Sequence, residues 1–132
     1  MNHSKIVPIF TTDQLLILKE YYCKHFDFKV TFENESYLGI KAKGSETAEI
    51  GFMPPENGQS AYNGKGVTLC LDVEDVDAEY ERVKQEGLTI ATSLNNAPWG
   101  DRYFIVIDPI GISLYIYKQI EPTPEFKEYI KE

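Results

Sequence analysis

The sequence predicts an α+β fold built from two tandem modules, each with one strand, one helix and three further strands. Three observations lead to this prediction. Several short segments alternate apolar and polar residues at period two, which is typical of strands with one buried face. Two other segments carry an apolar stripe at helical spacing. The same order of segments occurs on both sides of a linker, 54–66, which is rich in proline, glycine and asparagine.

The first module is expected to span residues 5–53. Residues 5–12 predict a strand at a sheet edge or bulge, because Pro8 cannot donate a ladder hydrogen bond. Thr12 or Asp13 is expected to cap the helix that follows by accepting an N–H of its first turn. The helix carries one apolar stripe: Leu15, Leu18, Tyr22 and Phe26. Three strands joined by polar turns are expected after it: 28–33, 37–43 and 46–53.

The second module, 67–118, repeats this order. Residues 67–73 predict a strand by strict alternation. The helix that follows is expected to end at Gly87 in a left-handed cap. Its stripe has four members: Val73, Val76, Tyr80 and Val83. The remaining expected strands are 88–93, 103–107 and 112–118.

Turns and a short tail complete the expected chain. Residues 95–100 predict a turn, and in the next turn Asp108 is expected at the opening and Gly111 in a left-handed conformation. The segment 122–132 predicts a short polar helix beginning after one of its two prolines. A length of 132 residues is typical of one domain, so both modules are assigned to a single domain, 1–132.

Composition restricts the partners. The chain has 21 acidic and 13 basic residues, a formal net charge of −8, which disfavours nucleic acid and anionic membranes and favours a cationic ligand. No apolar run approaches the ~18 residues of a membrane span, and the first residues do not resemble a signal peptide, so a cytoplasmic location without membrane contact is expected. The two cysteines, Cys23 and Cys70, are too few for a disulfide framework and lack zinc-site spacing.

Local strings in a characteristic order carry a resemblance to a known family. They are the helix with Leu15 and Tyr21-Tyr22, the strand running into Val73-Glu74-Asp75-Val76-Asp77-Ala78, and Pro98-Trp99-Gly100 followed by Asp108-Pro109-Ile110-Gly111. Together they resemble the vicinal oxygen chelate superfamily, which includes glyoxalase I, extradiol dioxygenases, fosfomycin resistance enzymes and the bleomycin resistance proteins. The resemblance covers residues 5–119. It implies the glyoxalase/bleomycin resistance fold, in which the two modules form a curved mixed sheet around a concave groove.

Most enzymes of that superfamily hold a divalent metal with four His or Glu side chains. The resemblance places these four positions at Val7, Gly51, Thr68 and Tyr115. Such a set offers no imidazole, carboxylate or thiolate donor, so no metal or other cofactor is expected.

Other donors are poor substitutes for that set. A makeshift site of Glu49, Cys70 and Asp72 is the alternative, and it lacks histidine. His3 is expected in a frayed terminus, and His25 at the end of the first helix, where it complements the helix dipole.

Without the metal pattern, the chain resembles most the bleomycin resistance proteins, which are non-catalytic acidic dimers that sequester cationic antibiotics. The matching features are Val7-Pro8, Thr68 followed by Cys70, Trp99-Gly100 and the acidic charge. The resemblance implies a homodimer that binds a small aromatic or cationic molecule, with antibiotics among the candidates.

Alternation also predicts which side chains face the groove. Thr68, Cys70 and Asp72 are expected on the groove face of one strand, and Tyr115 and Tyr117 on that of another. Trp99, in a turn at the groove mouth, can stack on a planar or cationic ligand. The expected ligand-binding residues, none of them catalytic, are Trp99, Tyr115, Tyr117, Asp72, Thr68 and Glu49. In the alternative interpretation, Trp99 packs on Pro98, the tyrosines cover an otherwise exposed sheet face or fill a dimer contact, and the carboxylates are merely solvated.

Three functions remain open from the sequence. The first is a binding protein that sequesters a small molecule. The second is an enzyme of the same superfamily, such as a lyase, dioxygenase or glyoxalase-like enzyme, with an atypical or absent metal site. The third is an interaction module whose groove is filled by its own side chains.

Overall fold

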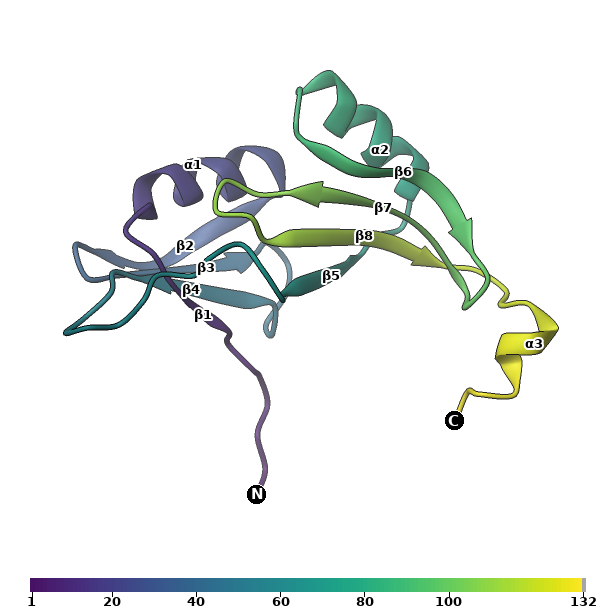
Figure 1. Ribbon diagram of the computed structural model, residues 1–132, viewed down its shortest axis with the longest axis horizontal. Coiled ribbons are helices and arrows are strands. Elements are labelled where there is room, and N and C mark those ends of the chain that lie inside the picture. The colour runs from purple at the N-terminus through teal and green to yellow at the C-terminus, as the bar shows by residue number, and fades with distance from the viewer. Residues whose placement is uncertain (132) are drawn as a thin grey trace. The chain divides into compact units, whose positions relative to one another are not determined.

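Two four-stranded sheets, each with a helix on one face, form the described part of the chain (Figure 1). The computed structural model describes residues 1–131, and residue 132 lies outside this part. The chain divides into two compact units between Lys65 and Gly66, called module 1 and module 2 below. Both modules have the predicted order of one strand, one helix and three strands, which confirms the α+β prediction. The groove expected between them stays a prediction.

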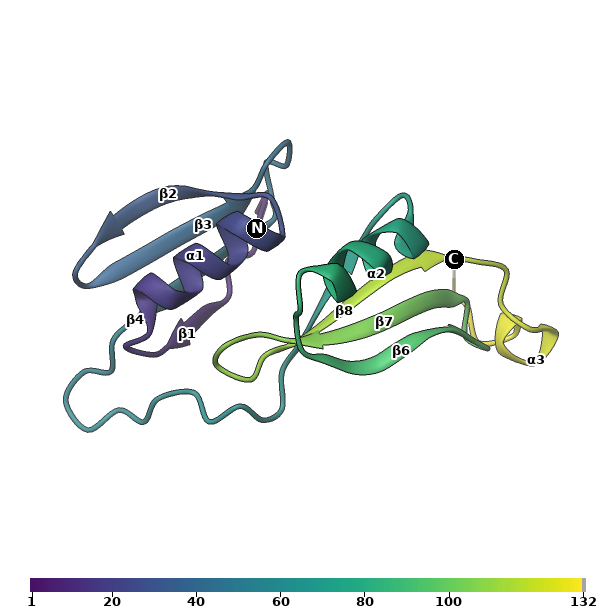
Figure 2. The same cartoon turned by 90° about the horizontal axis from the view of Figure 1, so that it is seen from above.

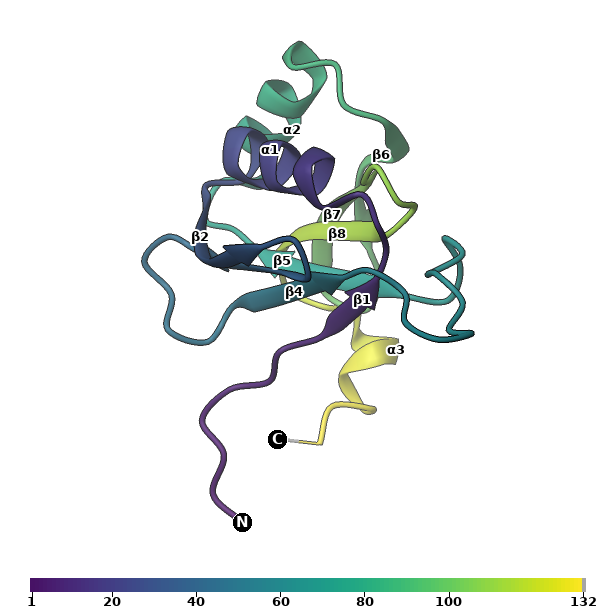
Figure 3. The same cartoon turned by 90° about the vertical axis from the view of Figure 1, so that its left-hand side faces the viewer.

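Module 1 has one edge strand that runs parallel to its neighbour, and antiparallel pairing elsewhere. Its elements are β1 (Ile9–Thr11), α1 (Leu15–His25), β2 (Phe28–Asn34), β3 (Tyr37–Ala42) and β4 (Glu49–Met53). The strand order is β1-β4-β3-β2. The expected position of the first strand at an edge is confirmed, but β1 begins only after Pro8, whose carbonyl accepts the N–H of Gly51. Figure 3 shows α1 lying over one face of this sheet.

The core of module 1 lies between α1 and the sheet. Leu18 and Tyr22 of α1 are completely buried, and the Tyr22 ring packs against Phe28 and Phe52 at centroid distances of 5.3 and 6.1 Å. The predicted apolar stripe therefore faces the sheet.

The predicted cap of α1 is wrong. The N-cap residue is Gln14, which makes no side-chain capping bond. Thr12 Oγ1 accepts the N–H of Gln14 itself at 3.1 Å, one residue before the helix begins. The hydroxyl is engaged in the tight turn that leaves β1, a local use of Thr that competes with capping. Asp13 is exposed and takes no part in the cap.

Module 2 repeats the arrangement with a different tail. Its elements are β5 (Thr68–Asp72), α2 (Val76–Gln85), β6 (Ile90–Ala97), β7 (Asp101–Ile107), β8 (Ser113–Gln119) and α3 (Pro124–Lys127). The strand order is β5-β8-β7-β6, with β5 parallel to β8. Figure 2 shows β6, β7 and β8 side by side in the sheet, and α2 contacts all three strands. None of the helices within residues 1–131 is long and apolar enough to cross a membrane.

Both ends of α2 follow from local chemistry. Asp75 caps the start, because its Oδ1 accepts the N–H of Ala78 at 3.0 Å. At the other end Gly87 has φ 73°, which confirms the predicted left-handed cap. The N–H groups of Gly87 and Leu88 bond to the carbonyls of Lys84 and Val83.

The end of β6 and the length of the tail helix differ from the prediction. Residues 95–97 belong to β6 and not to a turn, because Asn95 pairs with Tyr103 and Ala97 is buried against the sheet. The turn is thus only Pro98–Gly100. The predicted tail helix is limited to four residues, α3, and the end of the predicted segment 122–132 lies outside the described residues.

Candidate functional site

The sheet of module 2 has one face covered by α2 and an opposite face, called here the open face. Phe104, Val106, Leu114 and Ile116 are buried on the α2 side. Their alternation partners lie on the open face: Asp101 and Tyr103 of β7, and Tyr115 and Tyr117 of β8. Cys70 pairs with Tyr115 and Asp72 with Tyr117, so β5 adds Thr68, Cys70 and Asp72 to the same face.

Four aromatic side chains form a row across the open face. The rings of Tyr103 and Tyr115 are stacked, with centroids 4.4 Å apart and planes at 18°. Tyr117 continues the row 5.6 Å from Tyr115, and Trp99 continues it 6.1 Å from Tyr103. We call Trp99, Tyr103, Tyr115 and Tyr117 the aromatic row. The Trp99 side chain remains 49% exposed, so one end of the row is accessible to a ligand.

A hydrogen-bond chain fixes the row. The indole Nε1–H of Trp99 donates to the hydroxyl of Tyr115 at 3.0 Å, and this hydroxyl donates to Asp101 Oδ2 at 2.8 Å. Burial raises the pKa of Tyr115, and the hydrogen bond and negative charge of Asp101 raise it further, although the Trp99 bond acts in the opposite direction. Tyr115 therefore stays a neutral phenol that links the turn tryptophan to the aspartate.

Two residues of the open face, Asp101 and Tyr103, were not predicted from the sequence to belong to the site. Asp101 was placed outside any strand, although it begins β7, and Tyr103 was placed in a strand without a role. The alternation that predicts the face of Tyr115 also predicts that of Tyr103, so this signal was available. Nothing in the local sequence indicates that Asp101 meets Tyr115, because they lie on different strands, 14 residues apart.

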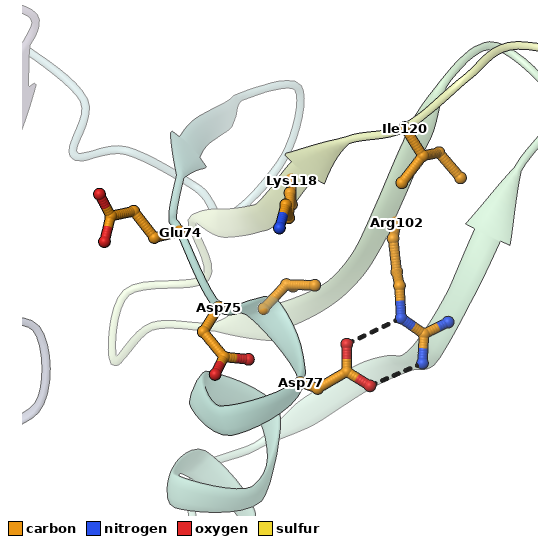
Figure 4. A pocket seen from close by; sticks show the side chains of 7 residues that line it. Glu74, Asp75, Asp77, Arg102, Lys118 and Ile120 are labelled. Atoms are coloured by element: carbon orange, nitrogen blue, oxygen red, sulfur yellow. Dashed lines mark hydrogen bonds and ion pairs between the residues drawn. The ribbon is translucent and has the colours of Figure 1, made fainter.

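Charges are segregated between the two faces of this sheet. Within the described strands β5–β8, the acidic residues Asp72 and Asp101 lie on the open face, whereas the basic residues Arg102 and Lys118 lie on the α2 side. Arg102 makes two hydrogen bonds of 2.9 Å to Asp77 at the start of α2, which hold the guanidinium away from the open face (Figure 4). The open face therefore presents negative charge beside aromatic rings.

The Arg102 ion pair lies at a shallow pocket on the α2 side. This pocket has a volume of about 450 Å³ and contains three acidic and two basic side chains (Figure 4). The hydrogen bond from Arg102 holds the pKa of Asp77 below its usual value. Of the charged side chains in this pocket, Arg102 and Asp77 form an ion pair, and Asp75 accepts the N–H of Ala78.

The Cys70 thiol and the Tyr117 hydroxyl on the open face stay neutral at ordinary pH. Burial, and then the charge of Asp101, raises the pKa of the Cys70 thiol. Burial, and then the charge of Asp72, raises the pKa of Tyr117. Thr68, at the start of β5, is exposed and pairs with Ser113 of β8.

Five of the six expected ligand-binding residues thus lie in module 2. The strand residues Thr68, Asp72, Tyr115 and Tyr117 share the open face, and Trp99 reaches that face from the adjoining turn. Glu49 belongs to module 1, where its carboxylate accepts a hydrogen bond from Lys5 Nζ at 2.9 Å.

The four positions where related enzymes hold a metal can be compared between the modules. In module 1, Gly51 pairs with Ile9, which lies two residues after Val7. In module 2, Tyr115 pairs with Cys70, which lies two residues after Thr68. Gly51 and Tyr115 therefore occupy equivalent places in the two sheets.

A tyrosine ring lies over each of these two places. Tyr37 stands two residues before Gly39, the partner of Gly51, and a Cβ added at Gly51 would overlap the Tyr37 hydroxyl. Tyr103 stands two residues before Ile105, the partner of Tyr115, and stacks on Tyr115. Module 1 thus has no space for a ligand side chain at Gly51.

The side chains present do not fit a metal ion. Val7 and Gly51 have no side-chain donor atom, Thr68 offers only a hydroxyl, and the Tyr115 hydroxyl is already bonded on both sides. Within residues 1–131, no group of three or more His, Cys, Asp or Glu side chains that could hold an ion is found. Glu49 belongs to module 1 and Cys70 and Asp72 to module 2, so the makeshift set stays a prediction.

Comparison with known proteins agrees with this fold. Among solved structures, a superfamily member from Sphaerobacter thermophilus has a TM-score of 0.73 at 17% identity, over 89% of this chain and 98% of its own. TnmS3, an antibiotic-binding protein from Streptomyces, has a TM-score of 0.72 at 22% identity, over 90% and 97%. A bleomycin-binding protein in complex with bleomycin has a TM-score of 0.67 at 15% identity, over 89% and 99%. At these identities the likeness concerns the fold alone.

The sequence relatives have a higher identity than these structures, but over a shorter part of the chain. The uncharacterised protein Mb0911c of Mycobacterium bovis is 44% identical over 52 residues, which are 39% of this chain and 34% of that protein. The match thus spans only about a third of the curated relative. The family model described as glyoxalase/bleomycin resistance protein/dioxygenase superfamily matches residues 9–116. The chain therefore belongs to the glyoxalase/bleomycin resistance protein/dioxygenase superfamily.

Proposed function

We propose that this protein is a metal-free binding protein that sequesters a small planar aromatic molecule with a positive charge on the open face of module 2. The observation that carries the proposal is the aromatic row bonded to Asp101 on a face from which Arg102 and Lys118 are turned away.

The chemistry of the row suits such a ligand. A stacked aromatic pair contributes roughly 0.5–1.5 kcal/mol beyond simple burial, and a cation over a ring contributes about 0.5–2 kcal/mol. Asp72 and Asp101 add charge attraction. The donors of Trp99 and Tyr115 are already used within the protein, so the carboxylates favour a ligand that brings its own N–H donors.

The names of two structural relatives support a small-molecule ligand. TnmS3 is described as an antibiotic-binding protein, and another neighbour as a bleomycin-binding protein. An antibiotic with fused rings and an amine group would match the row and its aspartates.

An enzyme of the superfamily is the competing function. The site supports binding better, because Tyr115 is held neutral and none of the four metal positions carries an imidazole, carboxylate or thiolate donor. At Gly51 the Tyr37 ring also fills the space that a ligand side chain would need. Elemental analysis of protein purified without added metal separates the two functions. We expect no stoichiometric metal and no change in melting temperature with a chelator, whereas stoichiometric Ni, Mn, Fe or Zn would favour the enzyme.

We further propose a homodimer. Each sheet ends in two edge strands, β1 and β2 in module 1 and β5 and β6 in module 2, and exposed edges are usually protected by pairing. Sedimentation equilibrium at micromolar concentration should give twice the chain mass, and a 15.1 kDa monomer would contradict the proposal.

Isothermal titration with matched probes tests the binding function. We expect 9-aminoacridine, a planar cation at neutral pH, to bind at least about tenfold more tightly than 9-anthracenecarboxylate, a planar anion of similar size, which corresponds to about 1.4 kcal/mol. Equal affinity for the cation and the anion, or no binding of either probe, would contradict the proposal.

A further inference from the structure

We propose that the C-terminal segment, residues 122–130, forms part of the ligand site and adapts it to an elongated ligand of several rings. This inference rests on the proposed function. It assigns a role to Phe126 and Tyr129.

The segment extends the aromatic row beyond the sheet. The Phe126 ring lies 6.4 Å from Trp99, with the planes at 63°, and the Tyr129 ring lies 6.3 Å from Phe126 at 67°. Each ring therefore contacts the next from Tyr117 on β8 to Tyr129 in the tail. A ligand of a single ring system would cover only part of this surface.

The tail is bound to the same turn that carries Trp99. The N–H of Ile120 bonds to the carbonyl of Gly100 at 2.8 Å, and the N–H of Thr123 bonds to the carbonyl of Pro98 at 3.0 Å. Gly100 has φ 112°, and a Cβ there would lie 3.2 Å from the Ile120 carbonyl, so a glycine is required for this contact. Trp99 and the tail are therefore positioned together.

The exposure and charge of the tail favour a role in ligand binding over a role in the core. Tyr129 is 64% exposed and Phe126 is only partly buried. Between residues 122 and 130 the segment carries Glu125 and Glu128 against one lysine, Lys127, which is paired with Glu121. The tail thus continues both properties of the open face, aromatic rings and negative charge.

The short helix in this segment suggests how the ligand would be retained. α3 has four residues, too few to be stable without tertiary contacts. A ligand that lies along Trp99 and Phe126 would add such contacts. Its dissociation would require the tail to loosen, so a long ligand should dissociate more slowly than a short one.

The test compares a short and a long probe on tail variants. The short probe is 9-aminoacridine, and the long probe is a linear bisbenzimide dye, a chain of several ring systems with a basic amine. Phe126→Ala and Tyr129→Ala are each compared with the unaltered chain by isothermal titration. Phe32→Ala serves as a matched control, because Phe32 is an exposed aromatic residue of module 1.

We expect Phe126→Ala to lower the affinity for the long probe by about tenfold and the affinity for the short probe much less. Phe32→Ala should change neither affinity. If Phe126→Ala does not fold, Phe126→Leu retains apolar packing without the ring and should show the same selective loss. Equal affinity of all variants for the long probe, with the short probe still bound, would overturn this inference alone. Failure of the unaltered chain to bind either probe would overturn the proposed function together with it. A fall in oligomeric mass on Phe126→Ala with unchanged affinity would assign the tail to a subunit contact and overturn the inference.

Discussion

The indole N–H of Trp99 donates to the hydroxyl of Tyr115, 3.0 Å away on a different element, and this hydroxyl donates in turn to Asp101. The tryptophan is therefore fixed by a polar contact although half of its surface is exposed. An exposed ring held in one orientation loses little conformational entropy when a ligand stacks on it, which favours affinity.

Trp99→Ala should weaken the binding of 9-aminoacridine by about 1 kcal/mol or more, because the stacking surface at the end of the row is lost. The loss of fold stability should be small, since this side chain is not in the core. Titration and thermal melting of both proteins measure the two effects. A variant that binds as well as the parent but melts several degrees lower would make Trp99 a structural clamp, and would leave Tyr115 and Tyr117 as the candidates.

Tyr115→Phe should change how stability depends on alkaline pH. The folded pKa of Tyr115 is raised above the unfolded value of about 10, so its contribution is complete below that pH and is lost as the pH rises further. The variant lacks this group and should be less stable at neutral pH by about 1 kcal/mol, the usual worth of a hydrogen bond. The difference from the parent should shrink above pH ~10.

Denaturant unfolding at pH values on both sides of ~10 measures this difference. Tyr129→Phe, at an exposed tyrosine of the tail, is the control for the loss of one phenol hydroxyl. A difference between Tyr115→Phe and the parent that stays constant across this range would show that the Tyr115 hydroxyl is not held in its neutral form.

Removing the negative charges of the open face should selectively lower the affinity for a cationic ligand. Asp101→Asn keeps an oxygen that can accept from Tyr115 but removes the charge, and Asp72→Asn removes the second charge. Both variants should bind 9-aminoacridine less tightly and with a weaker dependence on salt, because charges are screened over ~8 Å at physiological ionic strength. Asp13→Asn, an exposed aspartate of module 1, is the control. Identical salt dependence in all four proteins would show that these carboxylates do not attract the ligand.

Much of this architecture follows from periodicity in the sequence. The alternation of apolar and polar residues predicts which side chains of β5 and β8 share a face. The apolar stripe predicts the position of α2, and Gly87 predicts its end. The end of β6 could not be predicted, because Asn95 is typical of turns and pairs in the sheet only through its partner Tyr103.

Contacts between distant residues explain what the sequence did not reveal about the site. The chain from Trp99 through Tyr115 to Asp101 joins a turn to two strands, and no local pattern encodes such a meeting. The ring of Tyr37 over Gly51 is a second contact of this kind. The sequence shows a glycine at a position where related enzymes carry a metal ligand, and only the fold shows that the Tyr37 ring fills the space.

Gly51→Ala tests that relationship. The added methyl group would overlap the Tyr37 hydroxyl and should destabilise the fold by about 1–3 kcal/mol, the usual cost of overpacking. In a Tyr37→Ala background the same substitution should cost much less, and denaturant unfolding of the four proteins gives the coupling energy. Equal costs in both backgrounds would mean that Tyr37 does not occupy the space over Gly51.

The location of a bound planar cation decides whether the open face of module 2 is the ligand site. A crystal structure of the protein soaked with 9-aminoacridine should show the acridine plane against Trp99 and the aromatic row, with a nitrogen within hydrogen-bond distance of Asp101 or Asp72. Ligand density on the α2 side, for example in the pocket beside Arg102, with none against Trp99, would contradict the account.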